Sequence, residues 1–78
     1  MITVRYFAGA AEAAGVDGES LTAADVGALR EAMVAAHGPA FARVLERCAL
    51  LADGARVEGD SPLADGANVD VLPPFAGG

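Results

Sequence analysis

The residues best suited to chemistry lie at the C-terminal end of the chain, in the segment Leu72-Pro73-Pro74-Phe75-Ala76-Gly77-Gly78. Pro73 and Pro74 fix φ and lack an N–H, so they should end a strand and hold the chain extended. Gly77 and Gly78 lack a Cβ atom, so a chain that ends in them can enter a tunnel too narrow for any other residue. We therefore expect residues 75–78 to form a flexible tail. Its reactive group would be the Gly78 carboxylate, once that group is activated, commonly as a mixed anhydride with AMP.

Two features of this segment have a simpler explanation. A terminal Gly-Gly could be a frayed end or a cloning remnant, although the preceding prolines and strand pattern favour a function. Phe75 could fold back over Leu72 and cap the edge of the sheet. It could instead pack with Pro74 against a partner, since aromatic side chains are favoured anchors in interfaces. We expect the second arrangement, with Pro73, Ala76 and Gly77 also in the contact.

The other reactive side chains do not form a catalytic or metal-binding set. His37 is the only histidine and falls in the last turn of a predicted helix, where it complements the helix dipole. Cys48, the only cysteine, lies at helical spacing with Phe41 and Leu45 and is expected to be a buried, unreactive thiol. The carboxylates are scattered, and no glycine run follows a strand as in a phosphate-binding loop. We expect no bound metal or cofactor and no catalysis by the chain itself.

Composition narrows the class of partner. The chain has 78 residues, enough for one small domain, and 54% of them are hydrophobic, enough for a folded core. Five arginines and no lysine stand against eleven acidic residues, for a net charge of −6. We therefore expect no nucleic-acid or membrane partner, and docking on a basic patch of another protein. An unpaired cysteine and the lack of a signal or membrane-spanning pattern predict a cytoplasmic protein.

Two periodicities predict the elements that position the tail. Alternation over residues 2–7 and 68–72 predicts strands, and apolar spacing of three and four residues predicts a helix over residues 25–37. The shorter predicted elements are a helix at 10–14 ended by Gly15, a strand at 19–22 paired with the first strand, an amphipathic turn at 41–48, and strands at 49–52 and 56–57. The fold class is α+β, with the main helix across a mixed, mostly antiparallel sheet and the last strand in its centre.

The boundaries and the core of this arrangement follow from the same residues. Thr22 or Asp25 should start the main helix, and Gly38-Pro39 should stop it. The turns are expected at Asp53-Gly54 and Asp65-Gly66. The core should pack one helix face on the two central strands, burying Val26, Leu29 and Met33 against Val4, Val69 and Val71.

Several segments resemble the MoaD/ThiS family of ubiquitin-like sulfur carriers, most of all its molybdopterin synthase small subunits. They are the opening strand Ile2-Thr3-Val4-Arg5-Tyr6-Phe7-Ala8, residues 26–33 with their Ala28-Leu29-Arg30 centre, Pro62-Leu63-Ala64-Asp65-Gly66, and residues 68–78. The last of these ends in the family's Pro-Pro-x-x-Gly-Gly pattern. The resemblance covers the whole chain and departs from the pattern at Ala52-Asp53, where the family often has Val-Asn. That departure falls in a turn and should leave the tail chemistry intact.

The resemblance implies a β-grasp domain over residues 1–74, a tail over 75–78 and a carrier cycle. An adenylating enzyme similar to ubiquitin-activating enzymes (E1) would activate Gly78 with ATP, and a sulfur donor enzyme would convert it to a thiocarboxylate. The tail would then enter the large catalytic subunit of molybdopterin synthase, which would use the sulfur on a cyclic pyranopterin precursor. That subunit would supply the catalytic lysines and arginines, in a 2:2 assembly.

Other functions share the same tail. Carriers for thiazole or cysteine synthesis generally end in Gly-Gly without the preceding Pro-Pro. A ubiquitin-like modifier would use the same activation step and join the tail to target lysines. A passive binding module is a further alternative from outside the family.

Overall fold

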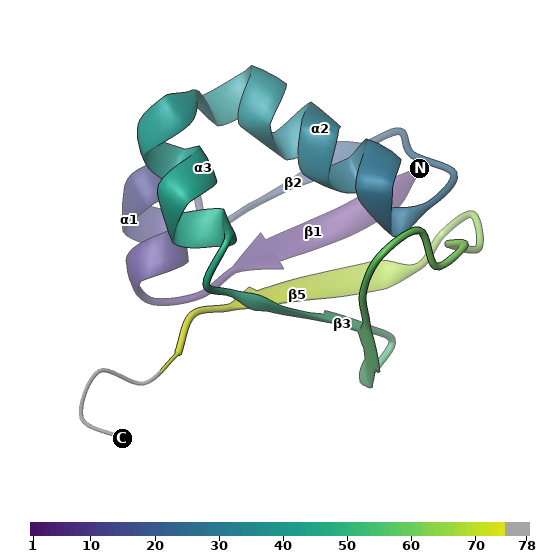
Figure 1. Cartoon of the computed structure of the whole chain (residues 1–78). Helices are drawn as coiled ribbons and strands as arrows, with labels where there is room; N and C mark the ends of the chain where they lie inside the picture. Colours follow the sequence, from purple (N-terminus) through teal and green to yellow (C-terminus); the bar gives the residue numbers. More distant parts are fainter. Residues whose placement is uncertain (75–78) are drawn as a thin grey trace.

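The computed structural model describes residues 1–74, and the expected tail residues Phe75, Ala76, Gly77 and Gly78 lie outside the described residues. Within residues 1–74 the elements are β1 (Ile2–Tyr6), α1 (Gly9–Ala14), β2 (Gly18–Leu21), α2 (Val26–His37), α3 (Pro39–Leu45), β3 (Ala49–Ala52), β4 (Ala55–Val57) and β5 (Asn68–Leu72). The strands form one sheet in the order β2-β1-β5-β3-β4, and the helices cover one of its faces (Figure 1). The α+β architecture predicted from the sequence is confirmed.

The last strand lies in the middle of the sheet, as predicted. β5 pairs in parallel with β1, where Val4 is opposite Val69 and Tyr6 is opposite Val71. The other three pairings, β1–β2, β3–β4 and β3–β5, are antiparallel. A parallel pair needs a long crossover connection, and the chain between β1 and β5 supplies it with the helices that cover the sheet. The first and last strands are thus neighbours in the centre of the sheet.

The boundaries of α2 follow from local chemistry. The Asp25 side chain accepts a hydrogen bond from the Ala28 N–H at 2.7 Å, which caps the helix, so Thr22 is not its start. Gly38 follows the last helical residue with a φ of 89°, a positive value that glycine adopts readily, and its N–H donates to the Val34 carbonyl at 2.8 Å. Pro39 then opens α3, because a first-turn residue needs no N–H for the helix. The amphipathic turn predicted at 41–48 is this helix, which begins two residues earlier, at Pro39, and ends three residues earlier, at Leu45.

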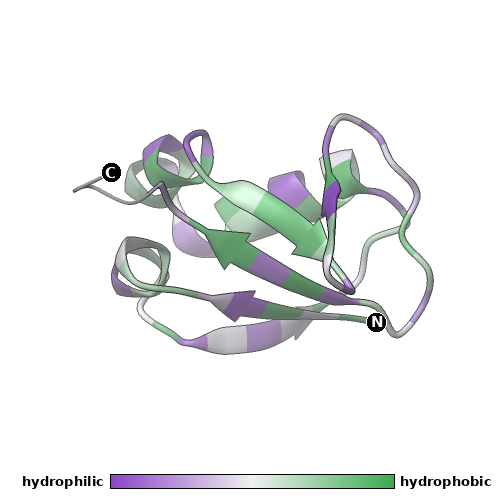
Figure 2. Ribbon diagram, turned by 90° about the horizontal axis from the view of Figure 1, so that it is seen from below, coloured by the Kyte–Doolittle hydropathy of each residue, from purple (hydrophilic) through white to green (hydrophobic). Residues whose placement is uncertain are grey.

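The core combines the two periodicities predicted from the sequence. Hydrophobic and polar residues alternate along β1 and β5 (Figure 2), and their inward side chains are buried under α2 and α3. All six residues expected in the core are fully buried: Val4, Val26, Leu29, Met33, Val69 and Val71. Four predicted strand bounds shift by one residue: the end of β1, both ends of β2, which is Gly18–Leu21 and not 19–22, and the start of β4, which is Ala55 and not residue 56. β1 ends at Tyr6 because the chain turns at Ala8, whose φ is 49°, and β2 begins at Gly18.

His37 belongs to a polar cluster that ties three elements together. Its Nε2 contacts the Glu19 carboxylate on β2, and the Tyr6 hydroxyl on β1 donates to the same oxygen at 2.5 Å. The His37 and Phe41 rings also meet edge-on, with centroids 5.2 Å apart. His37 therefore has the structural role expected from the sequence.

This cluster predicts how stability depends on pH. Burial alone would raise the pKa of Glu19, but hydrogen bonds from Tyr6 and His37 outweigh it and hold that pKa below its ordinary 4.5. Burial, then the bond to Glu19, raises the pKa of Tyr6 well above its ordinary 10.0. The Glu19 contribution is therefore present above about pH 4.5 and lost as the pH falls through the folded-state pKa. The Tyr6 contribution is present below about pH 10 and lost as the pH rises.

Urea denaturation across this pH range would test both contributions. Glu19→Gln should reduce the acid-side slope of the free energy of unfolding, and Tyr6→Phe should reduce the alkaline-side slope. Glu12→Gln is a matched control, because Glu12 is exposed on α1 outside the cluster. An acid-side slope that stays the same in Glu19→Gln would contradict the assignment.

Candidate functional site

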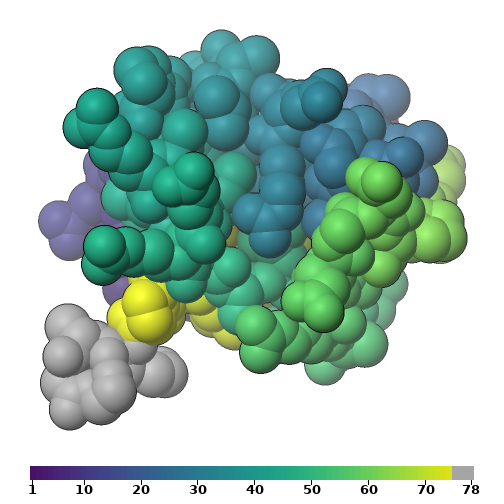
Figure 3. Space-filling view, in the orientation of Figure 1, coloured from purple at the N-terminus to yellow at the C-terminus, as the bar shows by residue number. Residues whose placement is uncertain are grey.

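The site lies where β5 leaves the sheet. Leu72, the last residue of β5, pairs with Ala49, and the chain continues into Pro73 and Pro74. The strand ends where the two prolines were expected to end it, because neither can donate to a ladder hydrogen bond. Pro74 is exposed. The last described residues, yellow in Figure 3, lie at the edge of the body below α3. The central strand therefore delivers the chain to the surface at one defined point.

A groove of about 460 Å³ lies beside this point, lined by Arg43, Val44, Arg47, Pro73 and Pro74. We call it the tail-root groove. Arg43 is in α3, Arg47 follows two residues after the end of that helix, and both line the groove together with Val44. Both arginines are exposed, and within residues 1–74 neither is in an ion pair.

The sheet face opposite the helices adjoins the same end of β5. By strand alternation, Ala49, Leu51 and Leu72 lie on this open face, and all three are half-buried. Phe7 follows β1, and its N–H donates to the Val71 carbonyl at 3.2 Å, which holds it next to the end of β5. Phe7 is 37% exposed. The open face is therefore apolar near the tail.

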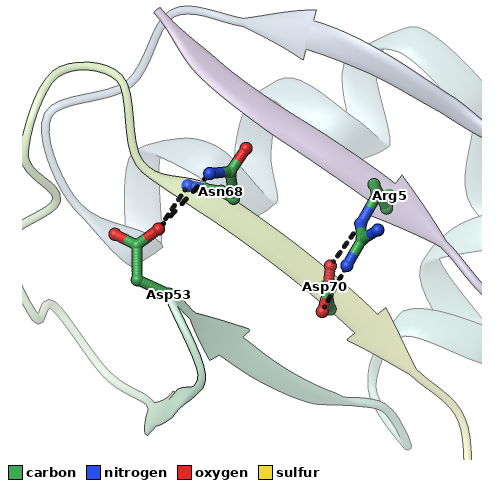
Figure 4. A network of polar contacts seen from close by, with 4 residues as sticks. All are labelled: Arg5, Asp53, Asn68 and Asp70. Atoms are coloured by element: carbon green, nitrogen blue, oxygen red, sulfur yellow. Dashed lines mark hydrogen bonds and ion pairs between the residues drawn. The ribbon is translucent and has the colours of Figure 1, made fainter.

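The remainder of the open face is polar (Figure 4). The Arg5 guanidinium donates to both Asp70 carboxylate oxygens, at 2.9 and 3.1 Å, and Asp70 raises the pKa of Arg5. At the start of β5, the Asp53 carboxylate accepts a hydrogen bond from the Asn68 N–H at 3.1 Å. The open face thus changes from polar to apolar along β5 toward Leu72.

The departure from the family pattern at Ala52-Asp53 lies far from the tail. Asp53 pairs with the start of β5, whereas the tail follows its end. Asp53 and Gly54 have φ values of 49° and 87°, which suit the tight hairpin turn between β3 and β4. Aspartate tolerates this backbone and also caps β5, so the difference is confined to the turn.

Cys48 is unsuited to sulfur chemistry in this fold. Its side chain is buried, and its thiol donates to the Val44 carbonyl at 3.2 Å. Burial raises the pKa of the thiol, and Arg30 offsets this only in part, so little thiolate forms near neutral pH.

Residues 1–74 contain no group of three or more His, Cys, Asp or Glu side chains that could hold a metal ion. Nor does any helix of this region have the length and apolar character needed to cross a bilayer.

Of the predicted site residues, the structure describes Pro73 and Pro74 and places both at the tail root. Gly78, the predicted reactive residue, lies outside the described residues together with Phe75, Ala76 and Gly77. Sequence reasoning missed Arg43 and Arg47. Their spacing of four residues on a predicted helix was a signal for a shared face, but the packing of α3 against the end of β5 was not visible.

Comparison with known protein families identifies the family of this chain. The profile of the ThiS family matches residues 4–78, from the first strand through the terminal Gly-Gly. The chain belongs to the ThiS family. A comparison with curated protein sequences gave no match.

Solved structures place this ThiS-family chain among ubiquitin-like β-grasp proteins. Small archaeal modifier protein 1 from Haloferax volcanii is 28% identical with a TM-score of 0.85, covering 99% of this chain and 98% of its own. A Pyrococcus furiosus protein described as molybdopterin converting factor subunit 1 is 27% identical with a TM-score of 0.79, covering 95% and 97%. A complex of subunits 1 and 2 of that factor from Helicobacter pylori matches at 24% identity and a TM-score of 0.72, covering 99% and 97%.

These findings confirm the β-grasp fold and the MoaD/ThiS resemblance. The chain is a ThiS/MoaD-like sulfur carrier or ubiquitin-like modifier, a class of small proteins that are generally carriers without catalysis of their own.

Proposed function

We propose that this chain is the sulfur carrier of molybdopterin synthesis, with the Gly78 carboxylate as its working group. The observation that carries the proposal is the continuity of the tail with the centre of the fold. The central strand ends in Pro73-Pro74 at the surface, and the ThiS-family match continues through Gly77-Gly78. A rigid strand end, and a terminal Gly77-Gly78 pair without side chains, suit a carboxylate that must reach an enclosed active site.

The proposed cycle divides the chemistry between this chain and its partners. An E1-like adenylating enzyme consumes ATP: a Gly78 carboxylate oxygen attacks the α-phosphorus, and pyrophosphate leaves. Sulfide (HS⁻) delivered by a donor enzyme then attacks the terminal carbonyl, the bond to AMP breaks, AMP leaves, and a thiocarboxylate remains. The large catalytic subunit of molybdopterin synthase takes that sulfur, in a 2:2 assembly with the carrier. The tail beyond Pro74, with Phe75 at its root, is the segment that the large subunit grips.

Intact-mass spectrometry tests the carrier chemistry. The chain is incubated with the adenylating enzyme of its own host, ATP and a sulfur donor. Replacement of one oxygen by sulfur, localised to Gly78 by fragmentation, is the expected result. The Cys48→Ser variant should react equally well. Sulfur on Cys48 instead of Gly78 would overturn the assignment.

The contribution of Phe75 to the synthase complex can be measured separately. Phe75→Ala should weaken binding to the large subunit by about 1–3 kcal/mol, because a buried aromatic anchor is lost from the interface. Val16→Ala is a matched control, since Val16 is an exposed apolar residue outside the tail-root groove and the apolar end of the open face. Titration calorimetry gives the affinities, and circular dichroism should show an unchanged fold. Tight binding to a thiazole or cysteine synthase, with none to the large subunit, would show that the pathway is wrong.

A modifier function is the second candidate, and the similarity to small archaeal modifier protein 1 favours it. In this case the activated Gly78 would form an amide with lysines of other proteins. The 78 residues contain no lysine, so side-chain-linked chains of this protein on itself cannot form through them. Conjugates isolated from the host should therefore carry single additions at each target lysine. Thiocarboxylate without high-mass conjugates would favour the carrier over the modifier.

A further inference from the structure

We propose that the tail-root groove binds an acidic segment of the adenylating partner, whose carboxylates pair with Arg43 and Arg47. The inference rests on the proposed function, because it assigns a docking contact to the enzyme that activates the tail. It concerns residues of α3 and of the turn after it, not the tail itself. Its starting point is the sign of the charge at the groove.

The groove is positive on a strongly negative chain. The 78 residues carry eleven acidic side chains and a net charge of −6. Among residues 1–74, however, those that line the groove include two arginines and no carboxylate. Elsewhere in the described chain, Arg5 is already paired with Asp70. Arg43 and Arg47 have no such partner within residues 1–74, and Glu46, between them in sequence, forms no ion pair with either. Their charges are therefore available to another protein.

The residues that line the groove suit a carboxylate ligand. Guanidinium groups present a planar set of donors that matches a carboxylate with two parallel hydrogen bonds. Val44 and the rings of Pro73 and Pro74 make the rest of the lining apolar, so the aliphatic stem of a glutamate can pack there. The groove of about 460 Å³ has room for a short extended peptide segment.

The position of the groove points to the partner that handles the tail. Pro73 and Pro74 line the groove and are also the residues through which the chain continues to Gly78. Any enzyme that encloses residues 75–78 must therefore pass close to Arg43 and Arg47. A basic patch of the partner can still attract the acidic body at long range, whereas its contact at the tail root should be acidic. The two contacts together would fix the orientation in which the tail enters.

Kinetics of the adenylation step separate this contact from general charge effects. Pyrophosphate exchange is followed against carrier concentration, with the host's adenylating enzyme and the full chain. The double variant Arg43→Glu, Arg47→Glu should raise the carrier KM about tenfold or more, with kcat little changed, because binding is lost and the reacting groups are not. The difference should shrink at high salt. The double variant Arg43→Lys, Arg47→Lys keeps both positive charges and should therefore retain part of the affinity for the adenylating enzyme.

Arg56→Glu is the matched control for the single variants Arg43→Glu and Arg47→Glu, each of which should raise the carrier KM on its own. Arg56 is also exposed, and its substitution makes the same charge change as either single variant, but on β4, away from the groove. An equal rise in KM for this control would overturn the proposal in favour of net charge. A rise in the KM for ATP, with the carrier KM unchanged, would overturn it in favour of a nucleotide phosphate in the groove. Normal kinetics of the double variant would overturn the groove contact alone. Failure of the unaltered chain to be adenylated would instead overturn the proposed function.

Discussion

Leu29→Asp should leave the chain unfolded. Leu29 is fully buried in the face of α2 that packs on the central strands, and no cation lies in the core cluster to pair with a carboxylate there. An unpaired buried charge costs several kcal/mol, whereas domains are stable by only roughly 5–15 kcal/mol in total. A 78-residue domain with a thin core is expected near the lower end of that range. The circular dichroism and NMR spectra should be those of an unfolded chain.

Two further variants make this prediction specific to the buried face. Ala28→Asp adds the same charge one residue earlier, at an exposed position in the first turn of α2, and should remain folded. Leu29→Ala leaves a cavity without a charge and should cost about 2–5 kcal/mol, so it should melt at a lower temperature but still cooperatively. If Leu29→Asp melted like the unaltered chain, this helix face could not be the core.

The elements of the fold could be predicted because each has a local cause. Ile2, Val4 and Tyr6 alternate with polar residues in the sequence. In β1 these three side chains are buried, and the polar residues between them are exposed. The main helix has both a start and a stop in its own sequence, at Asp25 and Gly38. Some predicted strand ends were wrong by one residue, because the ends depend on turns. The turn at Ala8 has a positive φ that no residue pattern indicated.

The contacts that were not predicted join residues far apart in the chain. The cluster of Tyr6, Glu19 and His37 brings together β1, β2 and the end of α2, and no periodicity within one element indicates it. The tail-root groove likewise depends on how α3 packs beside the end of β5. Net charge describes the whole chain, so it predicted an encounter with a basic partner but could not indicate a positive groove at the tail root. Such features follow from tertiary packing, which the sequence specifies only through the complete fold.

The largest functional effect is expected at the last residue. Deleting Gly78, or replacing Gly77 by tryptophan, should abolish activation, because the carboxylate is then misplaced or the chain too wide for an enclosed site. Stability should be unchanged, since the described core runs from Ile2 to Val71 and does not involve these positions. Pyrophosphate exchange measures activation, and a melting curve measures stability. Gly9→Ala is a matched control, because an added Cβ there meets no atom within 4 Å, and this variant should be activated normally. If the Gly78 deletion still accepted sulfur, the working group would not be the Gly78 carboxylate, and fragmentation of the product would show which residue carries the sulfur.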